Sequence, residues 1–113
     1  MEIITEAIDL ARLREMAERR FGDMVKAVVD VEKGIMAVDA ELHADEEEVL
    51  LERGSAQTSL WGINLYPDVV EEDWIEFDPM INLRPSQGNR SRGVDDPGMR
   101  QKILEIVSRL VKR

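Results

Sequence analysis

The chain has 113 residues, 43% of them apolar, and it contains no cysteine. This length suits a single domain over residues 1–113 and allows a buried core that needs no metal or disulfide. A net charge of −9 makes nucleic acid an unfavourable partner, because an acidic domain repels phosphate backbones. The missing cysteines exclude disulfides, thiolate metal sites and thiol catalysis, and they fit a cytoplasmic protein.

Nothing in the sequence is typical of a membrane or secreted protein. No apolar run approaches the roughly 20 residues that a membrane helix needs. The first residues also lack the basic and apolar regions of a secretory signal. We therefore expect no contact with a membrane.

The first part of the sequence predicts a short edge strand, a helix and a β-hairpin. Residues 1–4 are expected to form the strand, and Asp9 is the expected N-cap of a helix that Gly22 ends. Apolar residues then alternate over 25–31 and again over 35–42, on either side of a turn at Gly34. This pattern indicates a hairpin.

The second part predicts further strands between two helices. Asp45 is the expected cap of the first helix, and Asp95 or Asp96 caps the last one, with Pro97 in its first turn. In chain order, we expect a helix over 45–53, strands over 60–66, 74–77 and 80–84, a polar loop over 85–95 and a helix from residue 97 onward.

These elements predict an α+β fold, with a mostly antiparallel sheet of about five strands and two to three helices packed on one face. The strand order stays open. We expect Trp61 in the core and leave the position of Trp74 open.

The loop over residues 84–93 is the strongest candidate for a binding site. No acid occurs between Pro79 and Val94, although the whole protein is acidic. Arginine side chains match carboxylate and phosphate groups, and glycines let backbone N–H groups approach a ligand. The candidate ligand-binding residues are Arg84, Ser86, Gln87, Asn89, Arg90 and Arg92.

Two other interpretations of this loop remain open. Its arginines can pair with the protein's own acids, for which Glu71, Glu72, Asp73 and Glu76 are the candidates. The loop can also be part of a protein interface. It does not match a phosphate-binding P-loop, because no Gly-Lys-Ser/Thr sequence follows it.

His43 is the only histidine, and it is the candidate acid or base of an enzyme. That role requires His43 and the arginine loop, by which we mean the loop at 84–93, to line one cleft within hydrogen-bond reach of a ligand. Because no second histidine exists, we expect no transition-metal site, and we expect no cofactor. A hard cation held by oxygen ligands stays open.

Four stretches of the sequence, at 25–46, 60–67, 75–78 and 82–93, resemble a family of small prokaryotic proteins of unknown function. The last of them, which reads NLRPSQGNRSRG, is the most distinctive. The resemblance implies a free-standing small domain, and it implies no activity, substrate or cofactor.

The leading hypothesis is a small binding module whose loop at 84–93 recognises an anion. The ligand would be a phosphate- or carboxylate-bearing metabolite, a nucleotide or an acidic segment of a partner protein. One alternative is a small enzyme that uses His43 on a phosphorylated or carboxylated substrate. The other is a regulatory or structural domain that pairs a strand edge with another chain. Whether the protein is an enzyme, and whether it is a monomer or homodimer, both stay open.

Overall fold

The computed structural model describes residues 1–70 and 72–113. The helices are α1 (Leu10–Arg20), α2 (His43–Glu52) and α3 (Pro97–Leu110). The strands are β1 (Glu2–Ile4), β2 (Ile8–Asp9), β3 (Val25–Asp30), β4 (Ile35–Val38), β5 (Leu60–Leu65), β6 (Ile75–Glu76) and β7 (Val111–Lys112). The short 3₁₀ helices are η1 (Gln57–Ser59), η2 (Glu72–Trp74), η3 (Met80–Asn82) and η4 (Pro85–Gln87).

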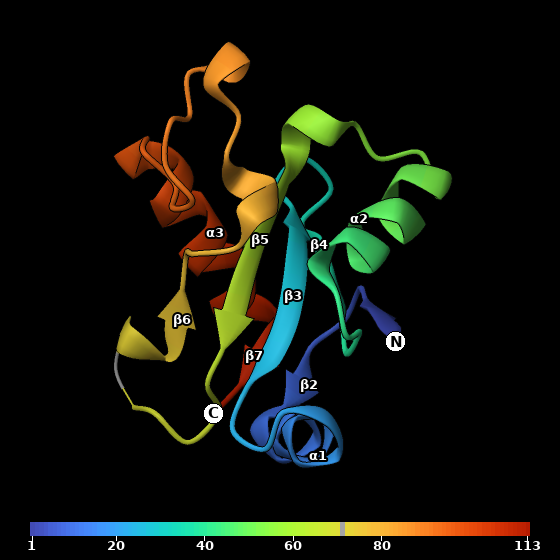
Figure 1. Cartoon of the computed structure of the whole chain (residues 1–113). Coiled ribbons are helices and arrows are strands. Elements are labelled where there is room, and N and C mark those ends of the chain that lie inside the picture. The colour runs from blue at the N-terminus through green and yellow to red at the C-terminus, as the bar shows by residue number, and fades with distance from the viewer. Residues whose placement is uncertain (71) are drawn as a thin grey trace.

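Five strands form an antiparallel sheet in the order β1-β4-β3-β5-β6, and β2 pairs with β7 in a small parallel sheet (Figure 1). The predicted α+β fold is therefore confirmed, and so is the edge strand at the start of the chain. The predicted hairpin is formed by β3 and β4. Gly34 takes a φ of 69° in its turn, a conformation that glycine adopts without steric cost.

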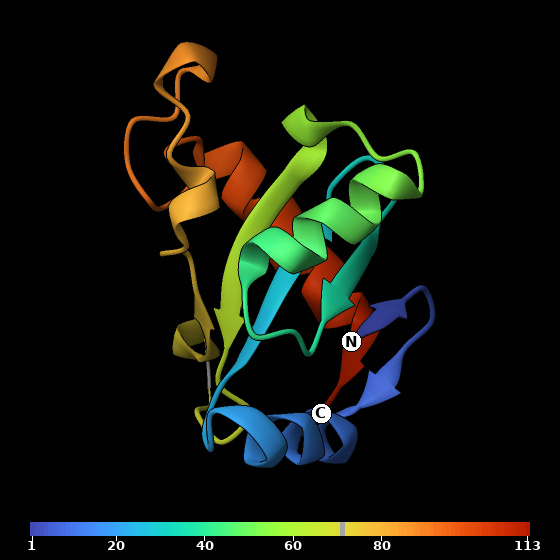
Figure 2. The same ribbon diagram turned by 45° about the vertical axis from the view of Figure 1, so that its right-hand side comes forward.

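The helices cover both faces of the sheet, whereas the sequence analysis placed them on one. α1 and α3 pack on the face that carries Val29 and Ile63, where most of the buried apolar residues gather. α2 covers the opposite face, over a small core of Val28, Ala37, Leu50 and Leu60 (Figure 2). The expectation was wrong for α2 because β3 has apolar residues on both faces. Its other valines and alanine point into the main core under α1 and α3, whereas Val28 points to the opposite face, which α2 covers.

The predicted helix starts hold for α1 and α3 but not for α2. Asp9 accepts a hydrogen bond from the Arg12 N–H at 2.9 Å, and Asp96 accepts one from the Gly98 N–H at 2.9 Å. Asp45 does not cap α2, because the helix begins two residues earlier, after Leu42. No described side chain caps this helix start.

The segment predicted as a strand over 80–84 instead begins as η3, and β6 is shorter than the predicted strand over 74–77. The Asn82 side chain explains the first difference. Its Oδ1 accepts from the Gly62 N–H at 2.7 Å and its Nδ2 donates to the Gly62 oxygen at 2.9 Å. The carboxamide thus takes the place of a neighbouring strand at the edge of β5.

Gly62 lets η3 approach the sheet closely. A Cβ at this position would lie 2.9 Å from side-chain atoms of both Pro79 and Ile81, closer than carbon atoms normally pack. The segment 79–82 consequently lies against β5 on the same face as α2, and this arrangement creates the cleft described below.

Within the described residues, no helix has both the length and the apolar composition needed to cross a membrane.

Candidate functional site

Two of the predicted ligand-binding residues, Arg84 and Asn89, are buried and make contacts inside the protein. The Arg84 guanidinium donates to the carbonyl oxygens of Ile81 and Gln57, at 2.9 and 3.1 Å. It also lies 3.5 Å from a carboxylate oxygen of Glu47 and stacks over the ring of Trp61. Such a side chain holds the loop to the domain and has few donors left for a ligand.

Asn89 organises the loop from within. Its Nδ2 donates to three carbonyl oxygens, those of Asn82, Ser91 and Gly93, at 2.6 to 3.1 Å. Its Oδ1 accepts from the Asp95 N–H at 2.8 Å. A single buried carboxamide therefore fixes the path of the loop from Asn82 to the start of α3.

The other predicted ligand-binding residues are exposed. Ser86 and Gln87 lie in η4, which projects at the top of Figure 1. Arg90 is exposed, and its backbone N–H donates to Asp95 at 2.8 Å. Arg92 is about half exposed, donates from Nε to the Asp78 carbonyl oxygen at 2.9 Å and lies 3.6 Å from the Asp78 carboxylate.

Internal pairing of the arginines occurs, but with partners that the sequence analysis did not name. Arg84 contacts Glu47 and Arg92 contacts Asp78. Glu76, one of the suggested partners, instead accepts from Asn64 and Tyr66. Suggested pairing with Glu71, or with the side chain of Glu72, lies outside the described residues.

The structure brings Arg92 and His43 to one cleft, which we call the His43 cleft. It has a volume of about 360 Å³ and lies between the start of α2 and η3, over the face of β3 and β5. The cleft is lined by Lys26, Leu42, His43, Ala44, Asn64, Asp78, Pro79, Met80, Ile81 and Arg92.

Lys26 and Asn64 are directly opposite each other in the β3–β5 ladder and face the cleft. The Asn64 Nδ2 donates to Glu76 at 2.7 Å, and this bond sets the orientation of the carboxamide. Its Oδ1 is buried and has no hydrogen-bond partner among the described residues. A buried acceptor without a donor is unfavourable, and the Asn64 side chain favours the protonated form of the neighbouring His43.

Burial favours the neutral form of His43, which occupies the first position of α2. Burial lowers its pKa from the ordinary value of 6.5, and nearby Lys26 lowers it further, although the contacts with Ile63 and with the Asn64 side chain act in the opposite direction. The Nε2 lies 2.9 Å from the Ile63 carbonyl oxygen, which can only accept, so Nε2 carries the proton. Only Nδ1 is then left to exchange a proton with a ligand.

The charges around the cleft favour an anion. Lys26 and Arg92 contribute two cationic groups, and Asp78 contributes one carboxylate. The start of α2 also lines the cleft, and the N–H groups of an uncapped helix start attract negative charge. Lys26 Nζ donates to the Glu41 carbonyl oxygen at 2.7 Å, which holds the ammonium group without neutralising it.

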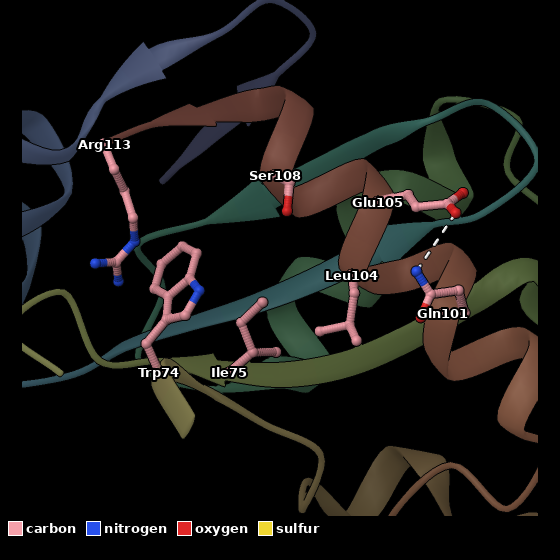
Figure 3. Close-up of a pocket in the computed structure, with 7 residues that line it drawn as sticks. All are labelled: Trp74, Ile75, Gln101, Leu104, Glu105, Ser108 and Arg113. Atoms are coloured by element: carbon pink, nitrogen blue, oxygen red, sulfur yellow. Dashed lines mark hydrogen bonds between the residues drawn. The ribbon is translucent and has the colours of Figure 1, made fainter. Parts of the chain in front are cut away.

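A larger surface groove lies elsewhere and contains none of the predicted site residues. It has a volume of about 590 Å³ and runs between β6 and α3, with Trp74, Ile75 and Leu104 as its apolar floor (Figure 3). Arg113 stacks on the Trp74 ring at one end, at 4.4 Å from the ring centre. We base the candidate site on the smaller cleft, because only there do cations, a histidine and a free helix start converge.

Across the described residues, no group of three or more histidine, aspartate or glutamate side chains is placed to hold a metal ion.

A family model described as "Protein of unknown function (DUF5674)" matches residues 2–110. The chain belongs to this family. No similar curated protein and no similar solved structure was found. Membership in the DUF5674 family agrees with the resemblance seen in the sequence, and it leaves the function to be argued from the cleft.

Lys26, Asn64 and Asp78 were not among the site residues expected from the sequence. A signal was present for the first two. β3 and β5 carry Lys26 and Asn64 on a face that is apolar further along, at Val28 and Leu60. A polar pair next to apolar residues on the same face indicates a place that no helix covers, but only the β3–β5 register shows that the two residues are neighbours.

Proposed function

We propose that this protein is a small binding module that recognises a carboxylate- or phosphate-bearing ligand in the His43 cleft. Arg92 provides the contribution of the loop at 84–93, and Lys26 provides the second cation. The observation that supports the proposal most directly is the convergence of these two cations with the uncapped start of α2 on one concave surface.

The ligand's anionic group would lie between Lys26 and Arg92 and accept hydrogen bonds from the first N–H groups of α2. Asp78 opposes this binding, because its carboxylate is the present partner of Arg92. A ligand therefore has to compete with Asp78 for the guanidinium.

The proposal is tested by NMR titration of the ¹⁵N-labelled protein with acetate and inorganic phosphate, at constant ionic strength with chloride as the balancing anion. We expect shifts centred on the amides of His43, Ala44 and Asn64. Arg92→Gln should weaken binding by about tenfold, as expected for a lost charged hydrogen bond. Arg90→Gln is the matched control, because it removes the same charge from the same loop outside the cleft.

A gain of affinity gives an independent check. Asp78→Asn removes the competing carboxylate but keeps the backbone oxygen that holds Arg92 Nε. Acetate and phosphate should then bind more tightly than to the wild type. The proposal is wrong if neither anion shifts the cleft amides, or if Arg90→Gln weakens binding as much as Arg92→Gln.

His43 would also serve the catalytic alternative at this cleft, because His43 and Arg92 line the same space. The Nε2–H of His43 donates to the Ile63 carbonyl oxygen, so a catalytic role would depend on Nδ1 alone. We propose binding as the function and treat turnover of a bound phosphate or carboxylate ester as a later question for the same cleft.

We also propose a cytoplasmic setting in a prokaryotic cell. The absence of cysteine supports a reducing compartment. The resemblance of the sequence to small prokaryotic proteins supports the source.

A further inference from the structure

Two exposed apolar side chains stand at the rim of the His43 cleft. Leu42 is 56% exposed and Met80 is 63% exposed, and both line the cleft. Among the described large apolar side chains only Val70, at 68%, is more exposed. Two of the three most exposed large apolar side chains among the described residues therefore lie at the candidate anion site.

Folding does not account for either side chain. Neither Leu42 nor Met80 belongs to the two clusters of buried and partly buried apolar residues. Leu42 stands at the N-cap position of α2, where serine, threonine, aspartate or asparagine would be more favourable. Two apolar residues that the fold does not need suggest contact with something apolar outside the chain.

The two sides of the cleft supply complementary chemistry. Leu42 stands on the α2 side and Met80 on the η3 side, where Pro79 and Ile81 extend the apolar surface. Lys26 and Arg92 add the cations to the same surface. A ligand that satisfies both parts carries an anionic group and an adjoining apolar chain.

We propose that the ligand of the His43 cleft is a soluble alkyl carboxylate, whose carboxylate meets Lys26 and Arg92 and whose chain lies over Leu42 and Met80. This inference rests on the proposed anion binding and adds the class of ligand. Inorganic phosphate would use the cations alone. An alkylammonium ion of the same length would meet cations with its charged end.

The test is a homologous series of acetate, butyrate, hexanoate and octanoate, kept below the concentrations at which they form micelles. Dissociation constants are measured by NMR titration of the His43 and Ala44 amides. Each added methylene should tighten binding by about two- to fourfold until the chain outgrows the apolar rim, as expected for partial to full burial of a CH₂ group.

Two variants and one control separate the parts of the ligand. Leu42→Ala and Met80→Ala should reduce the dependence of the affinity on chain length, so that the affinity for octanoate falls by more than the affinity for acetate. Val70→Ala is the matched control, because it removes a similarly exposed apolar side chain outside the cleft. Octylammonium chloride tests whether the chain binds without the anion.

The outcomes distinguish this inference from the function on which it rests. If acetate and octanoate bind equally well, the alkyl chain is not recognised and only the anion site stands. If neither these carboxylates nor phosphate binds, both proposals fail. The inference would be overturned if octylammonium bound as tightly as octanoate. It would also be overturned if octanoate shifted the NMR signal of the Trp74 indole instead of the His43 amide, because Trp74 lies in the separate groove of Figure 3.

Discussion

Three buried polar side chains, Asn82, Asn89 and Glu46, have different roles. The two asparagines replace missing backbone hydrogen bonds, Asn82 at the edge of β5 and Asn89 inside the arginine loop. Glu46, in α2, accepts from the Ala40 N–H at 3.1 Å through Oε2, while its Oε1 has no partner among the described residues. Of these three side chains, Glu46 is therefore the one in an unfavourable environment.

Burial raises the pKa of Glu46 from 4.5 to about 9, so the folded protein holds a neutral carboxyl group at pH 7. In the unfolded chain this group ionises near pH 4.5. The folded state therefore binds more protons between these two values. The contribution of Glu46 to stability is complete below the lower value and is lost as the pH rises toward about 9.

Glu46→Gln should remove this pH dependence, because the amide does not titrate. We expect the free energy of unfolding of the variant, relative to the wild type, to rise by about 1.4 kcal/mol per pH unit between pH 5 and about 8.5. Urea unfolding at several pH values measures the difference. Wild-type and variant curves that run parallel over this range would show that Glu46 titrates normally.

At the scale of elements, α2 differs from the other two helices. α1 and α3 have aspartate N-caps that accept backbone hydrogen bonds, whereas α2 starts after Leu42. The same helix packs on the smaller core and lines the His43 cleft. α2 therefore has an unfavourable N-cap residue beside a candidate binding site. This is consistent with a loss of stability that serves function.

Leu42→Ser should stabilise the protein, because a serine at the N-cap can accept from the N–H groups of the first turn. The expected gain is about 1 kcal/mol in the free energy of unfolding. It should appear as a rise in melting temperature of at least about 4 °C. The same substitution should weaken acetate binding, since the hydroxyl occupies donors that the anion would use.

Leu42→Ala is the control for this prediction, because alanine removes the leucine without providing a cap. Equal melting temperatures for the serine and alanine variants would mean that the N–H groups of α2 do not lack a partner in solution.

Across the whole molecule, the two faces of the sheet have cores of very different size. The α1–α3 face contains most of the buried apolar residues, including Leu13, Ile103 and Val107. The α2 face has four fully buried ones, Val28, Ala37, Leu50 and Leu60. Because hydrophobic stabilisation scales with buried area, α2 is held by a smaller share of it.

Native-state hydrogen exchange should therefore show α2 opening at a lower free energy than α3, in a step that leaves the main core folded. Leu50→Ala should accelerate exchange in α2 by much more than in α3. Val107→Ala should accelerate both, since its side chain belongs to the main core. Identical protection and denaturant dependence in α2 and α3 would contradict the prediction and indicate a single cooperative unit.

The sequence by itself determined the α+β class, the hairpin of β3 and β4, the edge strand β1 and the cap of α1. It also determined the start of α3, for which it left Asp95 and Asp96 open as the cap. These features depend on residues close together in the chain, such as Gly34 in its turn and Asp9 before its helix. Local rules of periodicity, turn conformation and capping are enough for them.

Tertiary structure alone decided the position of α2, the conformation of residues 80–82 and the composition of the cleft, because these features depend on residues that are distant in the chain. Periodicity cannot say which face of a sheet a helix covers, and so the position of α2 was missed. The segment at 80–82 left strand conformation because Asn82 pairs with Gly62, 20 residues away. The same folding buried Arg84, left Arg92 exposed and brought Lys26, His43 and Arg92 to one cleft. The chemistry of each residue is visible in the sequence, but its accessibility and its partners are set by packing.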